Sequence, residues 1–175
     1  LYKMQVRALV HAYLEVKKLG HDPQPEVMIP LVSTQRELLS LREILEEEIA
    51  HTFKGTAFDT EFPIGSMIET PRAAITADRL SAYADFFSFG TNDLTQYTLN
   101  HDRLDSPLPV SEVRSPEVLK LIQRVATACV EAEMPLGICG EAASDPVSAK
   151  LFIDYGVTSL SASPALLPSL ARELS

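Results

Sequence analysis

Side chains that could do chemistry follow three apolar runs of the sequence. Glu69 ends the run at residues 64–69, Asn92 and Asp93 lie shortly after the run at 86–89, and Cys139 ends the run at 136–139. Two carboxylates with open coordination positions suit Mg²⁺, which retains several waters and lets substrate oxygens complete its octahedron. A thiol at the end of a strand could act as a nucleophile, a metal ligand or a proton donor. These residue types are compatible with magnesium-assisted chemistry that uses a thiol.

Each of these residues also has a structural explanation. Glu69 directly precedes a helix start at Thr70, where a carboxylate interacts favourably with the helix dipole. Asp93 is of a type that is common in loop turns, and a cysteine is often a small buried hydrophobe. Cys129, on an apolar helical stripe, fits that last role. For Glu69, Asp93 and Cys139 taken singly, both interpretations stay open.

One segment and two arginines are candidates for binding an anion. The segment Gly90–Gln96 begins with a glycine, which permits close approach, and offers successive backbone N–H groups. Its position directly after an apolar run strengthens this interpretation. Arg72 and Arg103 could bind a phosphate or a carboxylate, with a solvent-exposed ion pair as the alternative for each. None of the four histidines has the spacing of metal ligands.

Five short apolar runs alternate with amphipathic stretches. The runs lack in/out alternation, as expected of parallel strands covered on both faces, and lie at residues 27–32, 64–69, 86–89, 136–139 and 157–161. Repeated strand–helix units predict an α/β fold with a parallel sheet, either open or closed. Because chemistry in such folds collects at the carboxyl ends of the strands, Glu69, Asp93 and Cys139 are expected at one rim.

The helices between these runs have clear start signals. A capping box at Thr34–Glu37 predicts one start. An N-cap residue followed by proline predicts four more, at Thr70, Ser115, Asp145 and Ser163. After Ser115, helical spacing predicts a buried stripe of Val118, Leu121, Ile122, Val125, Cys129 and Val130. The region between the third run and Ser115 is predicted to be a loop, with a long polar part from Asn100 to Arg114.

Composition excludes several classes of function. Lys and Arg number 15 and Asp and Glu 24, for a formal net charge of −9, so the basic footprint of a nucleic-acid-binding protein is absent. The acidic balance argues against an anionic membrane surface, and no apolar run approaches the roughly 18 residues of a membrane span. The two cysteines do not form a secreted disulfide framework, and no signal peptide is recognisable. We therefore expect a cytoplasmic protein.

Taken together, several segments resemble the phosphoenolpyruvate-utilising enzymes, a family that includes pyruvate phosphate dikinase, phosphoenolpyruvate synthase and enzyme I of the sugar phosphotransferase system. The resemblance runs nearly end to end and is carried by residues 2–8, 27–32, 66–74, 86–96 and 137–141. The stretches near Met28, Glu69 and Phe86 are most like the dikinase. Residues 96–99 and 141–143 are closer to enzyme I.

The resemblance implies roles for individual residues. Glu69 and Asp93 match the Mg²⁺ ligands of the family, and Cys139 matches the general acid/base that protonates C3 of the enolate. Arg103 matches an arginine that contacts the transferred phosphoryl group. The family's positions for holding phosphoenolpyruvate or pyruvate correspond to Glu69, Gly90, Thr91, Asn92 and Asp93.

The resemblance also implies a reaction and partners. In a dikinase, pyruvate, ATP and phosphate are interconverted with phosphoenolpyruvate, AMP and diphosphate through a phosphohistidine on another domain. No histidine of this chain matches that residue, so the phosphohistidine domain is expected elsewhere, and a homodimer formed through the barrel is expected. The alternatives are phosphoryl transfer from phosphoenolpyruvate to a protein, as in enzyme I, or an inactive module used for dimerisation.

Length bears directly on this expectation. A (β/α)8 barrel typically needs about 250 residues, whereas this chain has 175 and does not begin with methionine. The five strands are therefore expected to be the last five of a TIM barrel. Residues 1–175 would form a partial phosphoenolpyruvate/pyruvate-binding domain that lacks the first strands. By itself such a chain is expected to be inactive.

Overall fold

The computed structural model describes residues 1–58, 60–101 and 106–174. Its centre is a parallel sheet of five strands in the order β1-β2-β3-β4-β5, which confirms the predicted α/β class. The strands are β1 (Val27–Ile29), β2 (Ile64–Ile68), β3 (Phe87–Gly90), β4 (Leu136–Cys139) and β5 (Ser159–Leu160). Within the described residues, β1 and β5 each pair with a single strand. The sheet is therefore open at both edges.

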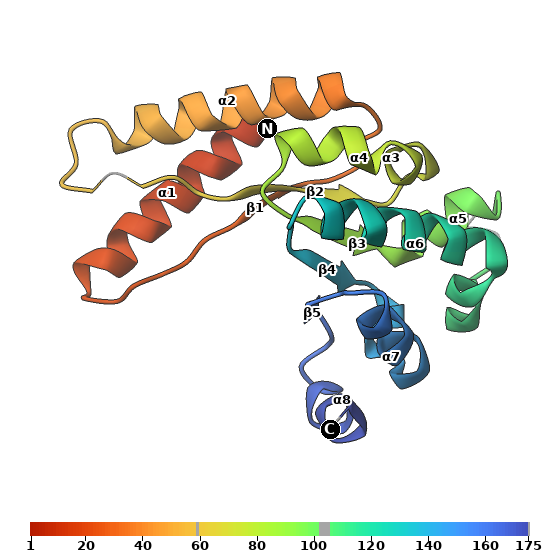
Figure 1. Cartoon of the computed structure of the whole chain (residues 1–175). Helices are drawn as coiled ribbons and strands as arrows, with labels where there is room; N and C mark the ends of the chain where they lie inside the picture. The colour runs from red at the N-terminus through yellow and green to blue at the C-terminus, as the bar shows by residue number, and fades with distance from the viewer. Residues whose placement is uncertain (59, 102–105, 175) are drawn as a thin grey trace.

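Helices connect successive strands (Figure 1). They are α1 (Tyr2–Lys18), α2 (Gln35–Phe53), α3 (Pro71–Ile75), α4 (Ala77–Leu80), α5 (Thr91–Thr98), α6 (Pro116–Glu131), α7 (Pro146–Asp154) and α8 (Leu167–Leu174), with short 3₁₀ turns η1 (Ser81–Tyr83), η2 (Val110–Arg114) and η3 (Glu141–Ser144). In Figure 1, α1 and α2 lie at one end of the molecule and α7 and α8 at the other. No helix of the described residues is long and apolar enough to cross a membrane.

Most of the predicted helix starts are confirmed. Thr34 and Glu37 form the reciprocal capping box of α2. The hydroxyl of Thr70 accepts the backbone N–H of Ala73 at the start of α3, and Asp145 caps α7 in the same way. Pro116 opens α6 as expected, although the Ser115 side chain makes no cap hydrogen bond.

Two predictions about helices were wrong. No helix begins at Pro164. Pro164 lies in a turn in which the Leu166 N–H donates to the Ser163 carbonyl at 2.9 Å, and α8 begins only at Leu167. Proline is favoured in such a turn, so the Ser-Pro signal marked a turn rather than a cap. The region after β3 was predicted as a loop, yet Thr91–Thr98 form α5. Its buried face uses two threonines beside Leu94, which hid the helical pattern.

The core is formed by the apolar runs and the helix stripes packed on them. Fully buried residues include Ile64, Ile68, Phe87 and Phe89 of the central strands. On α6 the predicted stripe is confirmed at Val118, Ile122, Val125 and Cys129. Leu121 is only partly buried, and Val130 is 69% exposed because it lies at the edge of that face, near the helix end. This packing fixes the strands whose carboxyl ends carry the polar residues.

Candidate functional site

The carboxyl ends of β2, β3 and β4 bring the predicted site residues together. Glu69 directly follows β2, Asp93 lies in the first turn of α5 directly after β3, and Cys139 is the last residue of β4. Strand register pairs Ile68 with Phe89 and Gly90 with Cys139. The rim expected from the sequence is therefore present, with a carboxylate, a second carboxylate and a thiol on three adjacent strands.

Glu69 is a buried carboxylate with a defined orientation. Its side chain is 4% exposed, and Oε1 accepts the backbone N–H of Leu31 at 2.6 Å. Leu31, which donates this bond, has a positive φ of 54°, a backbone conformation that is uncommon for a residue other than glycine. Burial raises the pKa of Glu69; the Leu31 N–H opposes this, and the charge of Asp93 and its hydrogen bond to Glu69 add to it. Two carboxylates are thus held against each other in a partly desolvated place.

Gly90 permits the close approach of Glu69. A Cβ at position 90 would lie 2.7 Å from Glu69 Oε2 and 2.8 Å from the Met67 sulfur. Real Cβ atoms do not come this close to other heavy atoms, so a side chain here would displace the carboxylate. The glycine at the start of the predicted anion-binding segment thus also makes room for the first of the two carboxylates.

The donor set at this rim fits a magnesium ion. The carboxyl groups of Glu69 and Asp93 lie in contact, and the negative charge of one disfavours ionisation of the other. A divalent cation bound between them would relieve this repulsion. Among the described residues there is no cluster of three or more His, Cys, Asp or Glu side chains suited to a metal. Mg²⁺ usually keeps several waters and is bound through one or two carboxylates, which this pair could provide.

Cys139 is a half-buried thiol beside these carboxylates. Its sulfur donates to the Phe89 carbonyl at 3.3 Å. Burial raises the pKa of the Cys139 thiol, the negative charge of Glu69 adds to this, a hydrogen bond with Ser88 opposes it, and Asp93 adds a smaller increase. The thiol is therefore protonated at neutral pH, which favours a proton donor over a thiolate nucleophile. Cys129, buried in α6 with a pKa raised to about 12, has no comparable polar neighbours.

Thr91 and Asn92 connect the start of α5 to the segment after Cys139. The Thr91 hydroxyl donates to the Cys139 carbonyl at 2.9 Å, and Asn92 Oδ1 accepts the Glu141 N–H at 3.2 Å. Gly140 between them has a φ of 99°, and a Cβ there would lie 2.5 Å from the Thr91 hydroxyl oxygen. First-turn N–H groups of a helix have no intrahelical partner and suit an anion.

Space for a ligand adjoins these residues. A cavity of about 600 Å³ is lined by Asn92, Gly140 and Glu141 together with hydroxyl-bearing residues that include Ser144, Ser161 and Ser163. A smaller cavity of about 80 Å³ also borders Asn92 and is lined by Thr95, whose buried hydroxyl has no hydrogen-bond partner among the described residues. Val110 lines both cavities as well, so the space offers an apolar wall together with hydroxyl and amide groups that could bind ligand oxygens.

Of the two candidate arginines, only Arg72 belongs to the described residues. Arg103 lies outside them. Arg72, in the first turn of α3, is exposed. Its charge is the smallest influence on Glu37, whose pKa is lowered mainly by hydrogen bonds from Ser33 and Thr34. Arg72 therefore lies towards the start of α2.

Sequence reasoning missed three residues of the site. Leu31 contributes through its backbone, and no pattern marks its positive φ. Arg114 reaches the segment after Cys139 from 31 residues away and was treated only as the end of a loop. Ser88 could have been found, because it is a polar residue in the otherwise apolar run Phe86–Phe89 and it lies next to the Cys139 thiol.

Comparison with known proteins agrees with this geometry. The family model of the PEP-utilising enzyme, PEP-binding domain, matches residues 1–175. Pyruvate, phosphate dikinase of Clostridium symbiosum is 38% identical over 183 residues, which cover 95% of this chain and 21% of that protein. Multiphosphoryl transfer protein of Xanthomonas campestris pv. campestris is 37% identical over 175 residues, covering 99% of this chain and 20% of that protein. The chain thus spans about a fifth of the length of these curated relatives.

Solved structures support the fold. A citrate lyase from Burkholderia xenovorans superposes with a TM-score of 0.66 at 17% identity, covering 99% of this chain and 53% of that one. An HpcH/HpaI aldolase from Desulfitobacterium hafniense gives a TM-score of 0.55 at 16% identity, covering 84% of this chain and 61% of that one. The five parallel strands alternating with helices are consistent with part of a (β/α)8 barrel. By its match over the whole sequence, this chain belongs to the PEP-utilising enzymes and corresponds to their PEP-binding domain.

Proposed function

We propose that this chain is the part of a phosphotransferase that binds phosphoenolpyruvate and pyruvate, most like that of pyruvate phosphate dikinase. In this proposal Glu69 and Asp93 hold Mg²⁺, and Cys139 exchanges a proton with C3 of the bound three-carbon unit. The observation that carries the proposal is the half-buried Cys139 thiol, with a raised pKa, beside the contacting pair of carboxylates.

The residues of the chain divide the chemistry between them. When the phosphoryl group leaves phosphoenolpyruvate, the electron pair of the broken P–O bond stays on the enolate of pyruvate. Cys139 then gives its S–H proton to C3 and becomes a thiolate, and in the opposite direction that thiolate removes the proton. When bound, Mg²⁺ would act as a Lewis acid that stabilises the negative charge developed during transfer.

The start of α5 would orient the substrate. Its first-turn N–H groups and the side chain of Asn92 lie where they could hold the phosphate or carboxylate oxygens. Gly90 and Thr91 keep this turn close to Glu69 and to the end of β4. Arg103 is proposed to contact the transferred phosphoryl group.

The remaining parts of the proposal lie beyond the chain. Residues 1–175 would form a partial TIM-barrel domain, completed by upstream strands that carry further substrate-binding groups. The phosphohistidine would reside on another domain of the same cytoplasmic enzyme, and the barrels would form a homodimer. By itself the chain is expected not to complete the reaction.

A second candidate is phosphoryl transfer from phosphoenolpyruvate to a protein, as in enzyme I. It is favoured by residues 96–99 and 141–143 and by a multiphosphoryl transfer protein that is nearly as similar as the dikinase, at 37% against 38% identity. A nucleotide-binding module upstream in the gene would support the dikinase, whereas its absence would support protein phosphorylation. An inactive dimerisation module would show no Mg²⁺-dependent ligand binding even with the upstream strands present.

Exchange of the C3 protons of pyruvate with deuterated water, followed by NMR, tests the role of Cys139. In the full-length enzyme with Mg²⁺, Cys139→Ala should abolish the exchange while Mg²⁺-dependent pyruvate binding persists. Cys129→Ala is the matched control, because this thiol is buried in α6 away from the rim. In this variant the C3 protons of pyruvate should exchange at the normal rate. Normal exchange in Cys139→Ala would refute the assignment.

A further inference from the structure

Arg114 links two segments that lie on either side of the site. It ends η2, after the long region from Asn100, and its Nη1 donates to Asp145 Oδ2 at 2.6 Å and to the Ser148 hydroxyl at 2.8 Å. Asp145 directly follows η3, the turn that begins two residues after Cys139. The guanidinium therefore fastens the end of η2 to the segment that leaves β4.

Asp145 is the centre of this contact. Besides Arg114, its Oδ2 accepts the backbone N–H of Ser148 at 3.0 Å and the Ser148 hydroxyl at 2.6 Å. Ser148 is completely buried. Burial works against ionisation of Asp145, but the hydrogen bonds from Ser148 and the charge of Arg114 outweigh it and lower the pKa of Asp145. The carboxylate is thus charged at neutral pH, so the ion pair with Arg114 is present at that pH.

The other end of the same segment is held by α5. Thr91 bonds the Cys139 carbonyl, and Asn92 accepts the Glu141 N–H. Gly140 provides the positive φ that lets the chain turn sharply between these two contacts. Residues 140–145 are therefore suspended between two anchors, the first turn of α5 and Arg114.

We propose that Arg114 is a positioning residue for Cys139 and Asn92, acting through Asp145 to hold η3 against the start of α5. With the strap of Arg114, Asp145 and Ser148 intact, the segment after Cys139 limits access to the thiol and fixes the Glu141 N–H on Asn92. The role of Arg114 in catalysis rests on the proposed function, whereas the positioning of the segment after Cys139 depends only on the fold.

Alkylation of Cys139 by iodoacetamide, together with amide hydrogen exchange, tests the strap in the chain of 175 residues. Arg114→Gln removes the charge and should speed both Cys139 alkylation and exchange of amides 140–145 by roughly three- to tenfold, because the ion pair is charge-assisted but partly exposed. Arg114→Lys, whose ammonium can still bond Asp145, should restore much of the protection. Arg124→Gln, which removes an exposed arginine from α6, is the matched control and should leave both rates unchanged.

A second variant separates the strap from the helix cap. Asp145→Asn keeps a good N-cap for α7 but loses the ion pair, and should accelerate alkylation as Arg114→Gln does. Combining the two substitutions should add little to either alone, because they break the same contact. An unchanged alkylation rate in Arg114→Gln would overturn the proposal. So would faster exchange spread evenly over all helices, since this would indicate a general loss of stability.

These measurements need neither substrate nor Mg²⁺. If pyruvate proton exchange does not depend on Cys139 but alkylation responds to Arg114, only the proposed function fails. If the alkylation rate does not change in Arg114→Gln while Cys139 remains essential for proton exchange, only the proposed positioning role of Arg114 is refuted.

Discussion

The buried carboxylate of Glu69 lowers the free energy of unfolding when no cation is present. Burial raises its pKa, and the Leu31 N–H offsets only part of this while Asp93 adds to it. A carboxyl with a raised pKa in the folded state keeps its proton longer than in the unfolded chain. Stability without metal is therefore lost as the pH rises from the ordinary value of 4.5 through the raised pKa.

Glu69→Gln should consequently stabilise the metal-free chain near neutral pH and have little effect below the ordinary pKa of 4.5. Urea unfolding at both pH values with EDTA measures this. The glutamine oxygen can still accept the Leu31 N–H, so the fold is preserved. Mg²⁺ should raise the stability of the wild type but not of the variant, whose affinity should fall by at least about a hundredfold, since even outer partners of a metal contribute about 10- to 100-fold.

Glu61→Gln is the control for this experiment, because Glu61 is an exposed glutamate just before the same strand. It should change neither the pH dependence nor the response to Mg²⁺. A Glu69→Gln variant that is less stable than the wild type at neutral pH without metal would contradict the burial argument. A variant that still gains stability from Mg²⁺ would contradict the ligand assignment.

Gly90→Ala tests the space that Glu69 needs. The new Cβ would meet Glu69 Oε2 and the Met67 sulfur within 2.8 Å, so we expect a loss of about 1–3 kcal/mol in the free energy of unfolding, and weaker Mg²⁺ binding. Gly137→Ala is the comparison, because its Cβ would meet the hydroxyl of Ser159 at 2.8 Å and that of Ser88 at 3.4 Å, with no contact to Glu69 among its three nearest atoms. Mg²⁺ affinity unchanged in Gly90→Ala would show that Glu69 does not need this space.

The sequence was sufficient to place Glu69, Asp93 and Cys139 at one rim, because parallel strands align their carboxyl ends whatever their exact lengths. It could not reveal the N–H of Leu31 on Glu69 or the reach of Arg114 to Asp145. Both contacts join residues more than 30 positions apart, and neither uses a residue type that marks its partner. Such pairs become visible only once the chain is folded.

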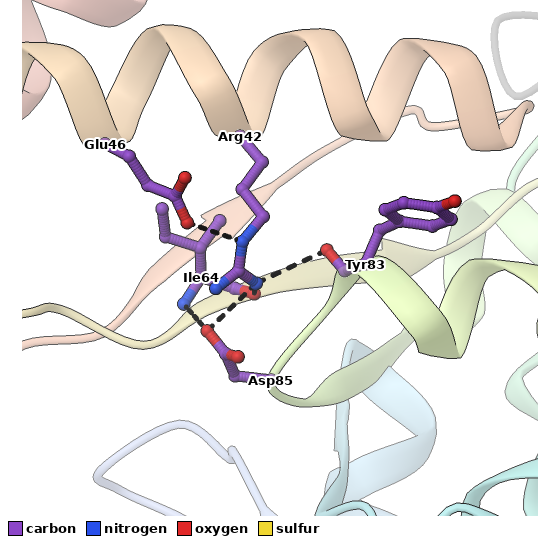
Figure 2. A network of polar contacts seen from close by, with 5 residues as sticks. All are labelled: Arg42, Glu46, Ile64, Tyr83 and Asp85. Carbon is purple, nitrogen blue, oxygen red and sulfur yellow. Dashed lines mark hydrogen bonds and ion pairs between the residues drawn. The ribbon is translucent and has the colours of Figure 1, made fainter.

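At the scale of the elements, a polar network at the opposite end of the sheet holds α2 to the strands (Figure 2). Arg42 of α2 pairs with Glu46 at 2.7 Å and with Asp85 at 3.1 Å. Asp85 in turn accepts the backbone N–H of Ile64 at 2.7 Å, while Arg42 also donates to the carbonyls of Ile64 and Tyr83. The network therefore ties the beginnings of β2 and β3, the strands whose carboxyl ends lead to Glu69 and to α5.

Asp85→Ala should lower the free energy of unfolding by about 1–3 kcal/mol, because the Ile64 N–H and the Arg42 guanidinium lose a shared acceptor. Asp85→Asn retains an oxygen for the Ile64 N–H and should lose clearly less. Chemical denaturation of both variants measures the difference. Equal losses would indicate that the charge of Asp85, and not its hydrogen bond to β2, carries the stabilisation.

Most elements with strong local signals were predicted correctly, whereas α5 and the start of α8 were not. The apolar run at 136–139 coincides with β4, and the Thr34 capping box opens α2. By contrast, α5 buries Thr91 and Thr95, polar residue types whose burial depends on packing against the rest of the fold. The Ser163-Pro164 pair forms a turn because proline suits turns and helix starts alike. Local chemistry was ambiguous in both cases.

For the whole molecule, the open sheet is the dominant feature. The edge strand β1 has one neighbour among the described residues, and Met28 on it is 37% exposed. Beside it, a cavity of about 330 Å³ is lined by apolar residues that include Val6, Leu9 and Val27. Unpaired strand edges with apolar surroundings favour pairing with other chains. In a completed barrel the same edge would be paired with an upstream strand.

Met28→Lys should therefore have different effects in the chain of 175 residues and in a longer protein that includes the upstream strands. In the chain of 175 residues, Met28→Lys places a charge on the exposed edge and should reduce self-association, measured by sedimentation velocity over a range of concentrations. In a protein that also carries the upstream strands, self-association through this edge should be absent. There Met28→Lys should lower the free energy of unfolding, by about 1–3 kcal/mol, because the lysine would have to be accommodated beside a paired strand. Two results would contradict the partial barrel: a chain of 175 residues that stays monomeric at all concentrations, or a longer protein whose stability Met28→Lys does not change. Either would indicate that the edge of β1 is already protected by the fold of the chain itself.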